Sequence, residues 1–183
     1  MEYLLYAAIG IAAIVVVFLI VVAIQPADFR IARTVAVEAP PAAIFPYVND
    51  LRRFDDWSPF AKLDPNMKKT YEGPEAGVGS SYSWSGNDQA GQGKMTIVES
   101  RPHERVRMNL DFTKPMECQN QVEFLLEQKG DKVHVSWIMT GTNNFIGKAF
   151  HLLFIERMVG GSFEEGLSKL KSIAEADAKK PVG

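Results

Sequence analysis

The chain has 183 residues, a formal net charge of −2 and a single cysteine. A charge this close to balance, without long runs of one sign, does not favour nucleic-acid binding, which needs clustered Lys and Arg. One cysteine, Cys118, excludes an intrachain disulfide framework and a paired-cysteine metal knuckle. We expect no nucleic-acid partner, no metal and no cofactor. The length suits one domain with an appendage.

The N-terminal segment is apolar enough to cross a membrane. Residues 3–24 contain no charge and no proline, and Gly10 is their only member outside the hydrophobic set. As a helix the segment spans about 33 Å, against a hydrocarbon core of about 30 Å. A cleaved signal peptide would need a basic start and a shorter apolar core, whereas Glu2 is the only charge here. We therefore expect residues 1–27 to be a single-pass anchor and a short tether, rather than a signal peptide or a buried core helix.

The charges that flank this segment predict an orientation. Glu2 precedes it, and Arg30 and Arg33 follow it. Lys and Arg close to the end of a membrane helix tend to stay on the cytoplasmic side. We therefore expect the remainder of the chain to face the cytoplasm.

Beyond the tether, polarity patterns predict a strand, short helices, several more strands and a long helix. Residues 29–37 alternate as a strand does. Pro40-Pro41 opens a helix over residues 42–48, and Pro46 should divide it into two short pieces. Further strands are expected at residues 70–73, 79–85, 93–100, 105–112, 117–128 and 133–140. Their short connections imply an antiparallel meander.

From residue 145 to residue 176 the apolar period becomes helical. Gly160-Gly161 implies a kink or a close backbone approach within this helix. The inner face of the sheet and the apolar side of the helix each need a partner. We therefore expect an α+β domain over residues 28–178, in which a curved antiparallel sheet packs against this helix, followed by a frayed tail, 179–183. The predicted core stripe of the helix is Phe150, Leu153, Phe154, Met158, Phe163, Leu167, Leu170 and Ala174.

Short motifs along the soluble part carry a resemblance to a known family. They are Ala39-Pro40, Trp57-Ser58-Pro59, Tyr71-Glu72-Gly73, Gly77-Val78-Gly79, Tyr82-Ser83-Trp84, Trp137-Ile138-Met139 and Phe163-Glu164-Glu165-Gly166-Leu167. Together they resemble the START-like (SRPBCC) superfamily, in its polyketide cyclase/dehydrase-like branch, over residues 29–176. The resemblance implies the helix-grip fold. Its members include lipid-transfer proteins, hydrophobic-ligand binders and cyclases, so the fold does not fix the function.

No strong catalytic motif is present. The sequence lacks HExxH, GxSxG, P-loop and CxxC patterns, and no second His or Cys stands at ligand spacing from His103, His134 or His151. His151, on the final helix, could act as an acid or base in a cavity, although a surface or partly buried histidine is the simpler interpretation. Asp55 and Asp56 fit solvated loop residues better than a catalytic pair.

Aromatic and methionine side chains gather on the expected inner face of the sheet. Core packing accounts for some of them, but the resemblance implies an apolar cavity between the sheet and the final helix. Cys118 and Asn120 share strand parity with the apolar residues and would supply the few polar groups of the cavity. The predicted lining is Tyr82, Trp84, Met95, Met108, Phe112, Cys118, Asn120, Phe124, Trp137, Met139, Phe154 and Met158.

The sequence therefore predicts a membrane-tethered domain that binds a hydrophobic small molecule or lipid. Two alternatives stay open. One is an enzyme of the cyclase or dehydrase type, which needs a polar constellation inside the cavity. The other is a non-catalytic interaction domain, which needs a filled cavity and an exposed apolar patch. The ligand and the oligomeric state are left open.

Overall fold

The structure, a computed structural model, describes residues 2–180 apart from the side chain of Phe154. Within these residues the chain forms one seven-stranded antiparallel sheet in the order β1-β7-β6-β5-β4-β3-β2. The strands are β1 (Asp28–Val37), β2 (Lys68–Glu72), β3 (Ser81–Ser85), β4 (Gln92–Arg101), β5 (Arg105–Lys114), β6 (Cys118–Lys129) and β7 (Lys132–Thr142). The helices are α1 (Glu2–Ile24), α2 (Pro41–Asn49), η1 (Leu51–Arg53), α3 (Phe54–Trp57), η2 (Pro59–Lys62), α4 (Phe145–Phe150), the π-helical turn η3 (His151–Ile155) and α5 (Glu156–Ala178).

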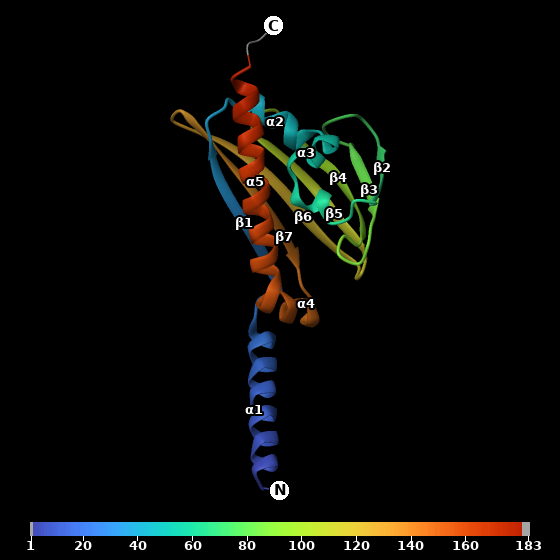
Figure 1. Ribbon diagram of the computed structural model, residues 1–183, viewed down its shortest axis with the longest axis vertical. Coiled ribbons are helices and arrows are strands. Elements are labelled where there is room, and N and C mark those ends of the chain that lie inside the picture. Colours follow the sequence, from blue (N-terminus) through green and yellow to red (C-terminus); the bar gives the residue numbers. More distant parts are fainter. Residues whose placement is uncertain (1, 181–183) are drawn as a thin grey trace.

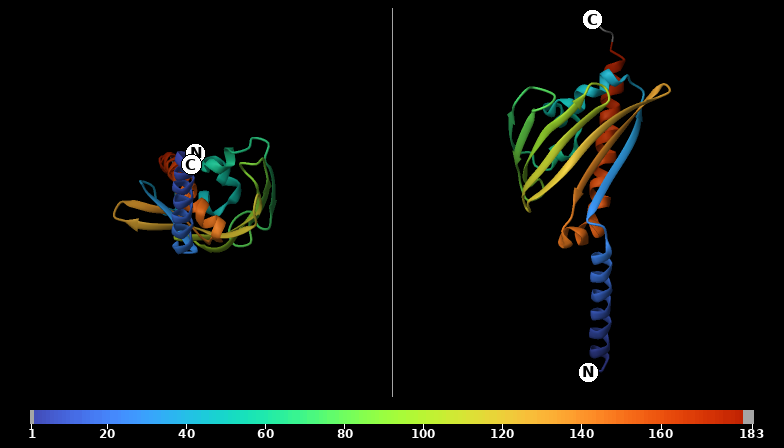
Figure 2. Two further views of the ribbon diagram at one scale, coloured as in Figure 1. Left: turned by 90° about the horizontal axis from the view of Figure 1, so that it is seen from below. Right: turned by 180° about the vertical axis from the view of Figure 1, so that it is seen from behind.

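The predicted α+β architecture of a curved sheet against a long C-terminal helix is confirmed. Strands β2 to β7 pair in chain order, and β1 returns to pair with β7. Figure 1 shows α5 running along the β1 and β7 side of the sheet, and these are the strands it contacts most. Figure 2 shows the rest of the sheet curving around α2 and α3. The concave face of the sheet is therefore covered by two sets of helices. Helix α5 covers the half with β1 and β7, and the short helices α2 and α3 cover the other half.

Two details of the helices differ from expectation. Pro46 lies inside α2 without dividing it. Its ring is exposed, and a proline at the sixth position of a nine-residue helix removes only one intrahelical hydrogen bond. The second difference is that α5 continues through Gly160 and Gly161. Gly160 instead permits a close approach, because a Cβ there would lie 2.2 Å from Nη2 of Arg33.

The irregularity of the final helix lies earlier, in the π-helical turn η3. The later part of the predicted stripe is buried as expected, from Phe163 to Ala174. The earlier part differs, because α4 and η3 lie at the ends of the strands (Figure 1) and contact the apolar cluster only in part, through His151 and Ile155. Phe150, Leu153 and Met158 are exposed there, which corrects their assignment to the core.

Helix α1 projects away from the sheet (Figure 1), and within it Val22 alone is buried. By length and mean hydropathy, 3.3 over its most apolar window, α1 qualifies to cross a membrane. A signal sequence near the N-terminus would satisfy the same two criteria. Arg30 and Arg33, on which the predicted orientation rests, both lie in β1.

Candidate ligand-binding site

The concave face of the sheet is built from cross-strand rows whose members alternate with solvent-facing residues. In one row Asn120 pairs with Leu110, Leu110 with Met95, Met95 with Tyr82, and Tyr82 with Tyr71. The neighbouring row runs Cys118, Phe112, Gly93, Trp84 and Lys69. Side chains at paired positions share a face. The register therefore places Lys69 and Tyr71 on the same face as the predicted lining.

Under α5 this face is filled by aromatic side chains. The rings of Trp137 and Phe163 stack at a centroid distance of 4.1 Å. Trp57 meets Trp137 and Phe124 edge-on, at 5.1 and 5.7 Å. Phe124 is fully buried and Trp137 is 3% exposed. These predicted lining residues contact one another and α5, so they do not surround a hollow.

Away from α5 the aromatic surface continues but is less covered. Four rings follow one another across β2, β3 and β5, with centroid distances of 5.8 Å from Tyr71 to Tyr82, 5.7 Å from Tyr82 to Trp84 and 5.4 Å from Trp84 to Phe112. We call these four residues the aromatic row. Trp84 is fixed because its Nε1 donates to the Ala90 carbonyl at 3.0 Å and its ring lies over Gly93, where a Cβ would clash. Tyr71, Tyr82 and Phe112 are only half-buried.

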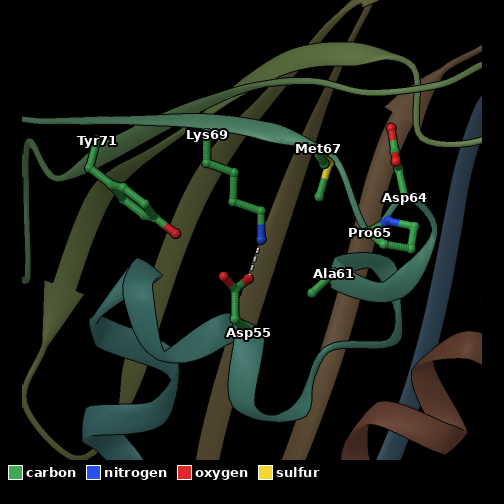
Figure 3. Close-up of a pocket in the computed structure, with 7 residues that line it drawn as sticks. All are labelled: Asp55, Ala61, Asp64, Pro65, Met67, Lys69 and Tyr71. Atoms are coloured by element: carbon green, nitrogen blue, oxygen red, sulfur yellow. Dashed lines mark hydrogen bonds and ion pairs between the residues drawn. The ribbon is translucent and has the colours of Figure 1, made fainter.

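A hollow of about 370 Å³ adjoins the aromatic row at Tyr71. It lies between β2 and the segment formed by α3 and η2 (Figure 3). Inside it the ammonium of Lys69 forms an ion pair with the carboxylate of Asp55, and the Lys69 side chain is only 15% exposed. The full lining is Asp55, Ala61, Asp64, Pro65, Met67, Lys69 and Tyr71.

The polar groups of this hollow have distinct tasks. Asp64 supports the loop, since its two carboxylate oxygens accept backbone hydrogen bonds from Asn66 and Asn87, each at 2.8 Å. Burial, reinforced by the negative charge of Asp55, raises the pKa of Tyr71 above its ordinary value. The same two causes raise the pKa of Tyr82. Both phenols therefore stay neutral at physiological pH, and the phenol of Tyr71, which lines the hollow, can donate a hydrogen bond to a ligand.

A second hollow, of about 750 Å³, lies at the α1 end of the sheet. Its lining, like that of the first hollow, is mostly polar, and it comes from β1, β5, β6 and β7. Asn120 is the member that it shares with the predicted site. The described residues contain no group of three or more His, Cys, Asp or Glu side chains that could hold a metal ion.

The predicted lining residues thus fall into separate groups. Tyr82, Trp84, Met95, Met108, Phe112, Phe124, Trp137 and Met139 belong to one apolar cluster or pack against it. Cys118 and Met158 are exposed. Phe154 lies outside the described side chains. His151 rests against the ring of Phe29 at 5.0 Å, and its buried Nδ1 has no hydrogen-bond partner in the described structure.

Sequence reasoning missed the residues of the hollow. Asp55 was interpreted as a solvated loop residue, and Lys69 was not considered. One signal was available: Lys69 and Tyr71 alternate in the strand that precedes Tyr82 and Trp84, so a hairpin pairing would have placed all four on one face.

Comparisons with known proteins agree with this architecture. Among solved structures, a protein from Chromobacterium violaceum is 15% identical, with a TM-score of 0.57 over 82% of this chain and 99% of that chain. An Aha1 protein from Colwellia psychrerythraea is 16% identical, with a TM-score of 0.55 over 83% and 99% of the two chains. CalU16 from Micromonospora echinospora is 16% identical, with a TM-score of 0.51 over 82% and 77%. At such identities the likeness shows the fold alone. No curated protein matches the chain.

The sequence model of one family, described as polyketide cyclase / dehydrase and lipid transport, matches residues 28–175. The match includes all seven strands and most of α5. The chain therefore belongs to this family, within the START-like (SRPBCC) superfamily.

Proposed function

We propose that the domain binds a hydrophobic or amphipathic small molecule, with lipid as the first candidate, and that α1 tethers it to a membrane. One observation carries the binding proposal: the half-buried aromatic row continues into a hollow of about 370 Å³. Small-molecule sites combine apolar surface with a few placed polar groups. Here the aromatic row supplies the apolar surface, and the hollow, whose lining is mostly polar, supplies the polar groups. The family description, which includes lipid transport, supports the same class of ligand.

The proposed site lies at a different place on the concave face from the one that the sequence predicted. The space under α5 is occupied by Trp57, Phe124, Trp137 and Phe163, so the ligand lies instead under α3 and η2. Its apolar part contacts the aromatic row. Its polar end reaches Lys69, which makes an anionic or hydrogen-bond-accepting head group the best match, in competition with Asp55.

The tether and the orientation belong to the same proposal. We place the domain on the cytoplasmic side of a single-pass protein. Arg33 already pairs with Glu156 and Glu164, so the exposed Arg30 carries most of the flanking positive charge. Protease added to intact cells should leave the domain uncut, whereas cleavage without permeabilisation would reverse the orientation.

Native mass spectrometry of the protein purified from its own membranes tests the binding proposal. The expected result is a co-purified amphipathic molecule. Ala61→Trp should exclude it, because Ala61 lines the hollow and an indole there would occupy the space. Ala42→Trp is the matched control, since Ala42 is exposed on α2. Equal ligand occupancy in the two variants would contradict the proposed site.

A second candidate, an enzyme of the cyclase or dehydrase type, is favoured by the polar group inside the hollow. Asp55, Lys69 and Tyr71 converge there from α3 and β2 (Figure 3). A catalytic carboxylate would make Asp55→Asn abolish turnover while leaving ligand uptake intact. Mass spectrometry of the molecule recovered after incubation distinguishes the two functions, because an enzyme of this type returns a product that has lost water or gained a ring.

A further inference from the structure

The register of β1 and β7 holds α4 beside the end of α1. Asp28 pairs with Thr142, and the amide of Asn143 donates to the Ala27 carbonyl at 2.8 Å. Helix α4 begins at Phe145, and α1 ends at Ile24. The few residues between Ile24 and Asp28 extend at most about 14 Å. Any environment that surrounds α1 up to its C-terminal end therefore also reaches α4.

An apolar surface faces outward at this place. Most of the large exposed apolar side chains outside α1 lie in α4, η3 and the first turn of α5, where the strands have ended (Figure 1). We call this set the α4–η3 patch. Its members are Phe145 (49% exposed), Ile146 (56%), Phe150 (52%), Leu152 (44%), Leu153 (54%) and Met158 (64%). A concentration of exposed large apolar side chains in one segment is typical of an interaction site.

The charges around the patch indicate its occupant. Lys148 and Arg157 lie in the same segment. Glu156 is its one acidic residue, and its carboxylate already lies 3.4 Å from the guanidinium of Arg33. An apolar face bordered by cations is typical of helices that lie in the interface of an anionic bilayer. A second protein chain would cover the patch, but it would not also explain why the patch adjoins an exposed apolar helix.

We propose that α4 and η3 lie in the surface layer of the bilayer that α1 crosses. The α4–η3 patch enters the boundary between head groups and acyl chains, while Lys148 and Arg157 meet anionic head groups. This inference rests on the part of the proposed function that makes α1 a membrane span. The patch then fixes the orientation of the domain relative to the bilayer. A single helix on a short tether would not restrict that orientation.

The orientation has a consequence for the binding site. Gly141 pairs with Asn120, and Cys118 pairs with Phe112. The β5–β6 turn and the Phe112 end of the aromatic row therefore lie at the same end of the sheet as α4. A domain docked through α4 and η3 presents this end of its concave face to the bilayer, which shortens the path for a lipid that enters from the membrane.

Depth-dependent quenching in vesicles tests the inference. The full chain, with Cys118→Ser, carries a single new cysteine labelled with the fluorophore NBD. It is reconstituted in phosphatidylcholine–phosphatidylglycerol vesicles that contain either a shallow or a deep nitroxide lipid. Three positions are compared: Ile14→Cys in α1, Leu153→Cys in the patch, and Asp131→Cys in the β6–β7 turn. Asp131 lies at the opposite end of β7, about 30 Å away along a strand of this length.

The three positions separate this inference from the proposed tether. We expect strong quenching at Ile14 by the deep nitroxide, because Ile14 lies at the middle of α1. By the shallow nitroxide we expect quenching at Leu153 at least about twofold greater than at Asp131, since interfacial helices sit about 5–10 Å deep. Quenching at Ile14 without an excess at Leu153 would overturn the inference while leaving the tether intact. Absence of quenching at Ile14 would overturn both.

A matched pair of variants isolates the patch. With the probe at Phe145→Cys, the substitutions Ile146→Asp and Leu153→Asp should abolish the excess quenching. Val78→Asp and Val98→Asp replace exposed apolar residues elsewhere on the domain, and they should leave the quenching unchanged. Circular dichroism checks that both variants are folded. Equal quenching in the two folded variants would contradict a role for the patch.

Discussion

The glycines of α5 show how much a single missing Cβ can mean. At Gly161 a Cβ would meet no atom within 4 Å. At Gly160 it would meet the flexible end of Arg33, whose Nε lies 2.6 Å from Glu164. At Gly166 it would lie 2.8 Å from the rigid indole of Trp137. Glycine is therefore dispensable at position 161. At position 160 a side chain can be accommodated if Arg33 moves, and at position 166 glycine is required.

This contrast yields a prediction for three alanine variants. Gly161→Ala should stabilise the fold by about 1 kcal/mol through helix propensity alone. Gly160→Ala should gain less, because Arg33 must move away from its exposed carboxylate partners, Glu156 and Glu164. Gly166→Ala should destabilise by about 1–3 kcal/mol through overpacking. Thermal unfolding in detergent micelles, followed by near-UV circular dichroism, measures the order, and a stabilised Gly166→Ala would contradict it.

The ion pair in the hollow provides a second prediction at the residue scale. If Lys69 binds the polar end of the ligand, Asp55 competes with that end. Asp55→Asn should then tighten the binding of an anionic amphiphile by up to about fivefold, the upper end of the range for one partly exposed ion pair. Lys69→Met should weaken it by a similar factor. The change in tryptophan emission on titration with the fatty acid oleate measures both affinities, and the uncharged analogue oleyl alcohol is the control.

At the scale of elements, the sequence predicted the strands better than the helices. Alternation along residues 105–112 and 117–128 indicates β5 and β6 because side-chain direction in a strand repeats every two residues whatever lies above the sheet. The apolar period around Phe150 and Leu153 carries no equivalent information. It shows that one side of a helix is apolar, but it does not show whether a sheet, a bilayer or another protein covers that side.

The candidate site was predicted less well for a related reason. Parity placed Tyr82, Trp84 and Phe112 on the concave face, but parity does not reveal which part of that face a helix fills. Phe163 fills the space beside Trp137 because α5 crosses there, and the crossing point depends on tertiary packing. Lys69 escaped notice because a charged residue on an inner face contradicts the usual pattern, and such exceptions gather at functional sites.

The end of α5 is held to α2 and η1 by a polar contact that should respond to pH. Tyr47 donates to the carboxylate of Asp177, and the guanidinium of Arg53 lies over the Tyr47 ring at 3.8 Å. Burial, together with this hydrogen bond, raises the pKa of Tyr47 to about 12. Hydrogen bonds from Lys180 and then Tyr47 lower the pKa of Asp177 below its ordinary value.

The two pKa shifts have opposite signs, so they limit the stability of the fold at opposite ends of the pH range. A phenol with a raised pKa contributes stability that is complete below pH 10, its ordinary pKa, and is lost as the pH rises toward 12. A carboxyl with a lowered pKa contributes stability above its ordinary pKa, 3.8, and loses it as the pH falls further. Tyr47→Phe should therefore cost about 1 kcal/mol at neutral pH and lose less stability than the parent between pH 10 and 12. Melting temperatures across this range test it, and parallel profiles for the two proteins would exclude the contact.

At the scale of the whole molecule, the domain and α1 are nearly separate structures. Within α1 only Val22 is buried, and the sheet, its short helices and α5 share one apolar cluster that excludes α1. Deleting residues 1–25 keeps Ala27 and its hydrogen bond with Asn143. The truncated protein should therefore unfold cooperatively, as a domain with its own core does.

The same truncation separates tethering from docking. Without α1, the α4–η3 patch alone should give weak binding to anionic vesicles, since interfacial helices bind through buried apolar area and attraction to anionic lipid. Added salt should weaken this binding, because it screens the attraction of Lys148 and Arg157 to the head groups. Co-sedimentation with vesicles measures it, and the truncated protein with Ile146→Asp and Leu153→Asp is the control. If the control binds as well as its parent, the patch does not contact lipid. If the truncated protein melts without a cooperative transition, α1 is part of the domain's core and not an appendage.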